Sequence, residues 1–68
     1  MIVDLEEFGR KVKNRRKESG MSLHRLSAMT TIPVGQLSDI ERGYGVSRMA
    51  AKLLSIALSI QDPFDNKK

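Results

Sequence analysis

Basic side chains are the most concentrated chemical feature of this 68-residue chain. Six of the twelve lysines and arginines fall between residues 10 and 17, and the formal net charge is +4. A small domain with this charge balance is electrostatically suited to bind a polyanion. A basic run on a helix can also be simply a solvated face, so the cluster alone leaves both interpretations open.

The other reactive side chains do not form a catalytic or metal-binding pattern. His24 is the only histidine and there is no cysteine, which disfavours a metal site. Asp39 and Glu41 are two residues apart, so on a helix they point to different faces and do not make a paired carboxylate site. No nucleophile–base pair and no glycine-rich phosphate loop is evident. We therefore expect no enzyme activity, no metal and no cofactor.

Length and hydropathy indicate one small domain. The longest apolar-rich run, residues 53–60, is too short to span a bilayer, and the N-terminus lacks the layout of a signal peptide. The absence of cysteine fits a reducing compartment. We expect a cytoplasmic protein that does not enter a membrane.

Residues 22–43 predict two short helices joined by a tight turn, and the rest of the chain is organised around them. The first helix, over 23–29, can be capped by the Ser22 hydroxyl. The second, over 33–42, is expected to begin at Pro33, which has no N–H and disfavours the α conformation in the residue before it. The apolar seam of the second helix and its stop signal are Ile32, Leu37, Ile40 and Gly43.

Two further helices are expected on either side of this pair, over 5–18 and 47–60. Asp4 and Ser47 are suitable caps, and Gly20 can end the first of the two. The residues expected to pack inwards are Leu5, Phe8 and Val12 in the first helix and Val46, Met49, Ala50, Leu53, Ile56, Ala57 and Ile60 in the last.

Leu54 and Leu58 fall off this apolar stripe, so we expect them to form a dimer interface together with Phe64. The alternatives are that a fifth element covers the two leucines and that Phe64 folds back onto the core. Residues 1–64 thus predict a single all-α domain, a compact bundle of four to five short helices. Residues 65–68 are expected to be a disordered tail.

The stretch from Gly20 to Gly43 resembles the helix-turn-helix of the phage-repressor family, of the Cro/CI (XRE) type. The most specific part is Leu37-Ser38-Asp39-Ile40-Glu41-Arg42-Gly43, and the resemblance extends over about residues 5 to 60. It implies a lambda-repressor-like fold and a DNA-binding transcriptional regulator, more often a repressor. Such a regulator binds double-stranded DNA as a homodimer on a pseudo-palindromic operator, with helix 33–42 in the major groove.

The same resemblance assigns base-reading positions to Val34, Gly35, Ser38 and Asp39. Val34 can touch a thymine methyl group, Ser38 can bond to either kind of base edge, and Asp39 can accept from a cytosine amine. Gly35 offers only a close approach of the backbone. The four contain no Arg, Lys, Asn or Gln, so the commonest bidentate contacts are missing.

Contacts to the DNA backbone are expected from flanking basic groups, one hydroxyl group and one helix N-terminus. They are Lys13, Arg16, Arg42, Tyr44, Arg48, Lys52 and, through its backbone N–H, Leu23. In the family, the arginine at the place of Arg16 pairs with the glutamate at the place of Glu41, and we carry this ion pair over. Two residues depart from the family pattern. Leu23 replaces a usual Gln, and Thr31 replaces a turn Gly, so the turn must avoid a left-handed conformation or be strained.

The depleted reading face supports a second hypothesis, a protein-interaction module that binds another regulator. The segment 33–42 carries Asp39 and Glu41 against one arginine, a balance that a groove lined by phosphates does not favour. A positive band across this helix and its flanks would support DNA binding, whereas a negative or apolar surface would support a protein partner. For a DNA-binding protein, the resemblance implies a bacterial or phage-encoded chain that works at the nucleoid.

Overall fold

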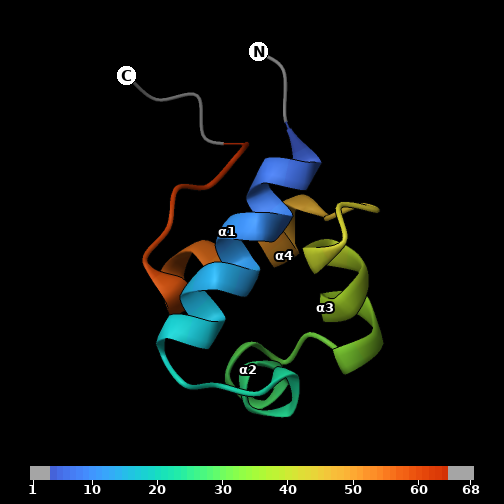
Figure 1. Cartoon of the computed structure of the whole chain (residues 1–68). Coiled ribbons are helices and arrows are strands. Elements are labelled where there is room, and N and C mark those ends of the chain that lie inside the picture. The colour runs from blue at the N-terminus through green and yellow to red at the C-terminus, as the bar shows by residue number, and fades with distance from the viewer. Residues whose placement is uncertain (1–3, 65–68) are drawn as a thin grey trace.

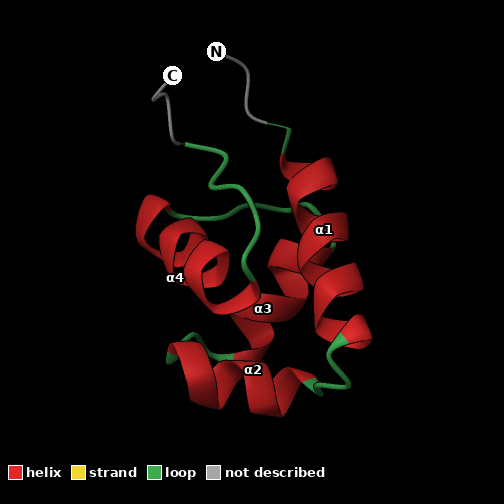
Figure 2. Cartoon of the chain, turned by 90° about the vertical axis from the view of Figure 1, so that its left-hand side faces the viewer, coloured by secondary structure: helices red, strands yellow, loops and turns green. Residues whose placement is uncertain are grey.

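Four helices make up the part of the chain that the computed structural model describes, residues 4–64. The expected tail over 65–68 lies outside the described residues. In Figure 1, α3 lies to one side of α1, α2 crosses below both, and α4 lies behind α1; Figure 2 shows the same arrangement turned by 90°. The all-α bundle is confirmed, with no strand in residues 4–64. The helices are α1 (Leu5–Glu18), α2 (Leu23–Thr30), α3 (Val34–Glu41) and α4 (Arg48–Leu58).

The helix ends follow the local chemistry that the sequence predicts. The side chains of Asp4, Ser22 and Ser47 each accept a hydrogen bond from the backbone N–H three residues on, at 3.0, 3.1 and 3.1 Å. Such caps satisfy N–H groups that have no partner inside the helix. Gly20 and Gly43 follow α1 and α3 in the left-handed conformation, with φ of 71° and 84°, and so end these helices.

The last helix is shorter than the range 47–60. It ends at Leu58 because Ser59 adopts a left-handed conformation, with φ of 58°. The N–H of Ile60 then bonds back to the carbonyl of Ser55 at 3.1 Å, which closes the final turn. Helix α4 therefore stops before Pro63 is reached.

The core draws on all four helices, because α1 and α2 each pack against both α3 and α4. Gly9 lies where α1 meets α3, and a Cβ there would collide with the carbonyl oxygens of Ile40 and Glu41. This close backbone contact fixes α3 against α1. The buried apolar residues are Phe8, Val12, Leu26, Ile32, Leu37, Ile40, Ala50, Ala51, Leu54 and Leu58.

The inward face of α4 is the predicted one only in part: Ala50 is buried, and Val46, Leu53 and Ile60 pack against the core. Leu54 and Leu58 lie in the core, 0% and 4% exposed, whereas Met49 and Ile56 are 72% and 71% exposed. Leu54 and Leu58 are therefore not available for a dimer interface. The apolar residues of α4 extend over more than one side of the helix, so helical spacing alone does not decide which of them are buried. Packing against α1 and α2 selects the side that is buried.

Phe64 folds back onto the core instead of projecting towards a partner. Its half-buried ring packs against the core cluster, and the Arg48 guanidinium lies 5.5 Å from the ring centroid. The N–H of Phe64 donates to the Asp62 carboxylate at 2.9 Å. The structure thus favours the second of the two roles considered for Phe64. Within residues 4–64, no helix has the length and apolar character needed to cross a membrane.

Candidate nucleic-acid interface

The turn between α2 and α3 fixes how the two helices meet. Thr30 is buried, and its hydroxyl donates to the carbonyl of Leu26 at 2.8 Å and accepts from the N–H of Ile32 at 3.3 Å. Thr31 adopts the left-handed conformation, with φ of 64° and ψ of 12°, and its hydroxyl donates to the carbonyl of Thr30. A β-branched residue rarely adopts this conformation, so the turn is strained at Thr31.

Arg16 and Glu41 form the expected ion pair, which ties α1 to the end of α3. Arg16 Nε and Nη2 donate to the two carboxylate oxygens of Glu41 at 2.7 and 3.1 Å, in a bidentate arrangement. Arg16 Nη1 also donates to the carbonyl of Met21, just before α2, at 2.9 Å. One guanidinium therefore fixes α1, the entry to α2 and the end of α3 relative to one another.

These bonds leave little of Arg16 for DNA. The side chains of Arg16 and Glu41 are only 11% and 8% exposed, and all three guanidinium nitrogens of Arg16 already donate within the protein. The hydrogen bond to Glu41 raises the pKa of Arg16, against the opposing effect of burial and with the help of the Glu41 charge. The structure therefore supports the ion pair and disfavours the phosphate contact expected for Arg16.

Of the four expected base-reading positions on α3, only two are fully exposed. Gly35 and Asp39 are exposed, but Val34 and Ser38 are half-buried at the edges of the helix. A Cβ added at Gly35 would meet nothing within 4 Å. Asp39 has no ion-pair partner within residues 4–64. The centre of this face thus presents a bare backbone segment and one free carboxylate.

Gln36 is an exposed α3 residue that the sequence pattern did not identify. At 100° per residue from the buried Leu37, position 36 falls at the border between the inward and outward arcs, so periodicity alone does not place it. The signal in the sequence is its residue type, because glutamine is one of the two side chains that bond bidentately to adenine.

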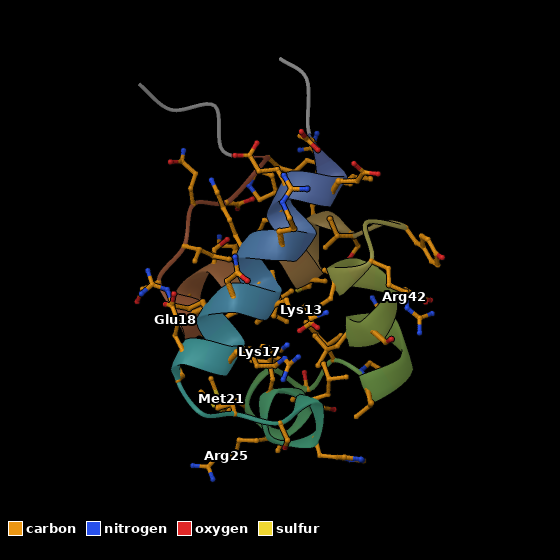
Figure 3. All side chains as sticks on the ribbon, in the orientation of Figure 1. Lys13, Lys17, Glu18, Met21, Arg25 and Arg42 are labelled. Carbon is orange, nitrogen blue, oxygen red and sulfur yellow. The ribbon has the colours of Figure 1, made fainter. Side chains whose placement is uncertain are left out.

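Cations flank this face on two helices. Figure 3 shows Lys13 and Lys17 projecting from α1 on the side towards the viewer, and Arg42, the residue directly after α3, projecting outwards. All three side chains are exposed. Arg25 points away from α2 at the far end of the molecule. Lys17 and Arg25 were not among the expected phosphate ligands. The sequence could have identified Lys17 on the same grounds as Lys13, because the two lysines lie one helical turn apart on α1.

The remaining expected backbone ligands are spread over the structure. The side chain of Leu23 packs against the core, so only its backbone N–H is left at the start of α2. Tyr44 is exposed directly after α3, and Arg48 begins α4 next to the Phe64 ring. Lys52 is exposed on α4, a helix that packs against α1 and α2 and lies behind α1 in Figure 1.

The assembled surface has the chemistry of an anion-binding site. It combines lysines, an arginine and a helix N-terminus around an exposed short helix. Within residues 4–64, no cluster of His, Cys, Asp or Glu could hold a metal ion.

Comparison with known proteins agrees with this geometry. A family model described as Helix-turn-helix matches residues 12–61, which include all of α2, α3 and α4 and the second half of α1. No curated protein matches the chain closely enough to count as a relative. The matched segment covers well over half of the sequence and includes the strained turn, the exposed α3 and the Arg16–Glu41 pair. The chain therefore belongs to the helix-turn-helix family of the Cro/CI type, a family of DNA-binding regulatory domains.

Proposed function

We propose that this protein is a transcriptional repressor that places α3 in the major groove of a double-stranded DNA operator. The observation that carries the proposal is the position of α3, which is exposed and fixed against α1 and α2, with Lys13, Lys17 and Arg42 beside it. In helix-turn-helix proteins the second helix enters the groove and flanking cations bind the phosphates.

Each group of residues has a distinct role in this proposal. Gly35 and Asp39 face the bases directly, with Val34 and Ser38 at the edges of the contact. The phosphates are bound by the flanking cations, by the Tyr44 hydroxyl and by the N–H of Leu23 at the start of α2. Arg48 is a further candidate if it leaves the Phe64 ring, whereas Lys52 is the weakest candidate because it lies on α4, which packs mainly against α1 and α2.

We further propose that the protein binds as a homodimer to a pseudo-palindromic operator, at the nucleoid in the cytoplasm of a bacterium or of a phage-infected cell. A two-fold operator matches a two-fold dimer, with half-sites about one helical turn apart.

The test is binding of the purified full chain to a random-sequence duplex over a range of salt concentrations. The logarithm of the affinity should fall linearly with the logarithm of the salt concentration, with a slope of about −0.9 per phosphate contact. The Arg42→Ala variant should bind more weakly and reduce this slope by about 1. Arg15→Ala is the matched control. This variant also removes one positive charge, but it removes it from a different surface. Arg15 lies on α1, where it lines a surface hollow with Glu18 and Ile60 and donates to the backbone carbonyl of Ser59.

A second candidate function is a protein-interaction module that binds another regulator. The observation in its favour is the exposed carboxylate of Asp39, without an ion-pair partner in residues 4–64, at the centre of the outer face of α3. A folded protein that binds no duplex at low or physiological salt would support this function and exclude the first. An equal effect of Arg42→Ala and Arg15→Ala would show that α3 is not the DNA-binding element.

A further inference from the structure

An amide and a carboxylate lie one helical turn apart on the outside of α3. Gln36 and Asp39 are both exposed, and a spacing of three residues places them 300° apart around the helix axis, which is the same side. Gly35, the residue before Gln36, has no side chain, and a Cβ added there would meet nothing within 4 Å. The absence of a side chain at Gly35 lets the backbone approach a surface closely, so both polar groups can reach it.

The two side chains select different bases by different chemistry. A glutamine amide has an NH2 group that donates and a carbonyl oxygen that accepts, and these match the N7 acceptor and the N6 amine of adenine. A carboxylate only accepts hydrogen bonds, and the major-groove edges of guanine and thymine present only acceptors. Asp39 therefore requires an amine and is repelled by guanine and thymine. Cytosine N4 is the usual partner of a carboxylate.

The distance between the two residues matches one step of the duplex. Three residues rise by about 4.5 Å along an α-helix, and neighbouring base pairs are about 3.4 Å apart. With the axis of α3 along the groove, two side chains at this spacing can reach neighbouring base pairs.

On the condition that α3 binds DNA as proposed, we infer that Gln36 is a base-reading residue and that it reads an adenine while Asp39 reads a cytosine of the neighbouring base pair. Each half-site of the operator then contains an adenine and a cytosine on adjacent base pairs, on the same strand or on opposite strands. Asp39 supplies selectivity chiefly by rejecting other bases, because an unpaired carboxylate in the groove weakens binding to every site without an amine.

The experiment is selection of binding sites from a random duplex pool by the wild-type chain and by three variants. Wild type should enrich sites with adenine and cytosine on adjacent base pairs. Gln36→Ala should lose the adenine preference, by about ten-fold or more in relative affinity, and keep the cytosine preference. Asp39→Ala should do the reverse and also bind unselected DNA more tightly.

Asp39→Asn is the variant that separates recognition from a structural effect. Asparagine bonds bidentately to adenine, so the preference at that base pair should change from cytosine to adenine. All three substitutions lie on the exposed face, and an unchanged thermal unfolding curve for each verifies the fold. If Gln36→Ala selects the same sites as wild type, the role of Gln36 is refuted while DNA binding by α3 stands. If the wild-type chain binds no duplex at all, the proposed function fails, and this inference fails with it.

Discussion

At the scale of single residues, the conformation of Thr31 is the least expected feature. The Cro/CI-type pattern that this chain resembles has a glycine at this place in the turn, and glycine adopts a left-handed conformation without strain. Thr31 adopts the same conformation with a branched side chain, at φ of 64°. The hydrogen bonds of Thr30 to Leu26 and Ile32 hold the chain on both sides of the strained residue.

We predict that Thr31→Gly stabilises the protein. Removal of the strain outweighs the greater flexibility of glycine in the unfolded chain, and the free energy of unfolding should rise by about 1 kcal/mol. Urea unfolding followed by circular dichroism measures this as a higher midpoint with an unchanged slope. Thr31→Ala is the comparison, because it removes the branch but keeps a Cβ, and it should gain less. A lower midpoint for Thr31→Gly would show that the turn is not strained.

The Arg16–Glu41 pair is the second feature at this scale, and its contribution to stability depends on its burial. Exposed ion pairs contribute little to stability, but removal of one partner from a buried pair leaves an uncompensated charge. Because the pKa of Arg16 is raised in the folded protein, the contribution of its charge to stability is fully present below the ordinary pKa of an arginine and is lost only as the pH rises through the raised pKa.

We predict that Arg16→Ala or Glu41→Ala lowers the free energy of unfolding by about 2 to 4 kcal/mol. The double variant should lose less than the sum of the two, since neither charge is then left alone. Lys11→Ala is the control, because its pair with Glu7 is half-exposed on both sides and should contribute at most about 0.5 kcal/mol. Strict additivity in a double-mutant cycle would contradict a coupled pair.

At the scale of elements, α4 shows how the apolar residues of one helix divide between core and surface. Leu54 and Leu58 point into the bundle, and Met49 and Ile56 point out. Exposed apolar residues that lie together often mark an interaction surface. Leu54 and Leu58 are buried, so they contribute to the stability of the fold and not to such a surface.

We predict that Leu54→Ala lowers the free energy of unfolding by about 2 to 5 kcal/mol, because it leaves a cavity in the core. Ile56→Ala should change it by less than about 0.5 kcal/mol, because Ile56 is already in water. Thermal unfolding of the two variants side by side makes the comparison. If α4 were buried on the stripe that contains Met49 and Ile56, the order of the two effects would be reversed.

At the scale of the whole molecule, size and charge suit two copies on one stretch of DNA. The described chain measures 32 × 21 × 19 Å, and operator half-sites of helix-turn-helix dimers lie about 34 Å apart. Two copies therefore fit side by side on one face of the duplex. The net charge of +4 favours this association and makes it sensitive to salt.

We predict that affinity for a duplex with two inverted copies of the selected half-site depends on their spacing. Binding should be tightest at a centre-to-centre distance of about 10 base pairs and weaker after insertion of about five more, which moves one half-site to the opposite face. Fluorescence anisotropy with the stoichiometry determined at each spacing tests this. Equal affinity at every spacing would mean that each copy binds alone and would refute the homodimer.

The sequence by itself determined that four helices form, the side-chain caps of α1, α2 and α4 and the two glycine stops, because these depend on residues no more than one turn apart. The resemblance to Cro/CI-type proteins supplied the Arg16–Glu41 pair, which no local pattern reveals. Predictions that rely on spacing within a helix therefore succeeded where a single face was apolar, as in α1 with Phe8 and Val12.

The tertiary structure alone decided which side of α4 is buried and which residues at the border of a helical face are exposed. The apolar residues of α4 extend over more than one side of the helix, and contact with α1 and α2 buried the side with Leu54 and left Met49 and Ile56 exposed. Exposure in the folded chain also placed Gln36 outside and Arg16 inside, because a residue at the border of a helical face is assigned by its neighbours on other helices and not by its own periodicity. Burial is a property of the assembled bundle, so the exposure of Gln36 and the partial burial of Val34 and Ser38 became visible only once all four helices were in place.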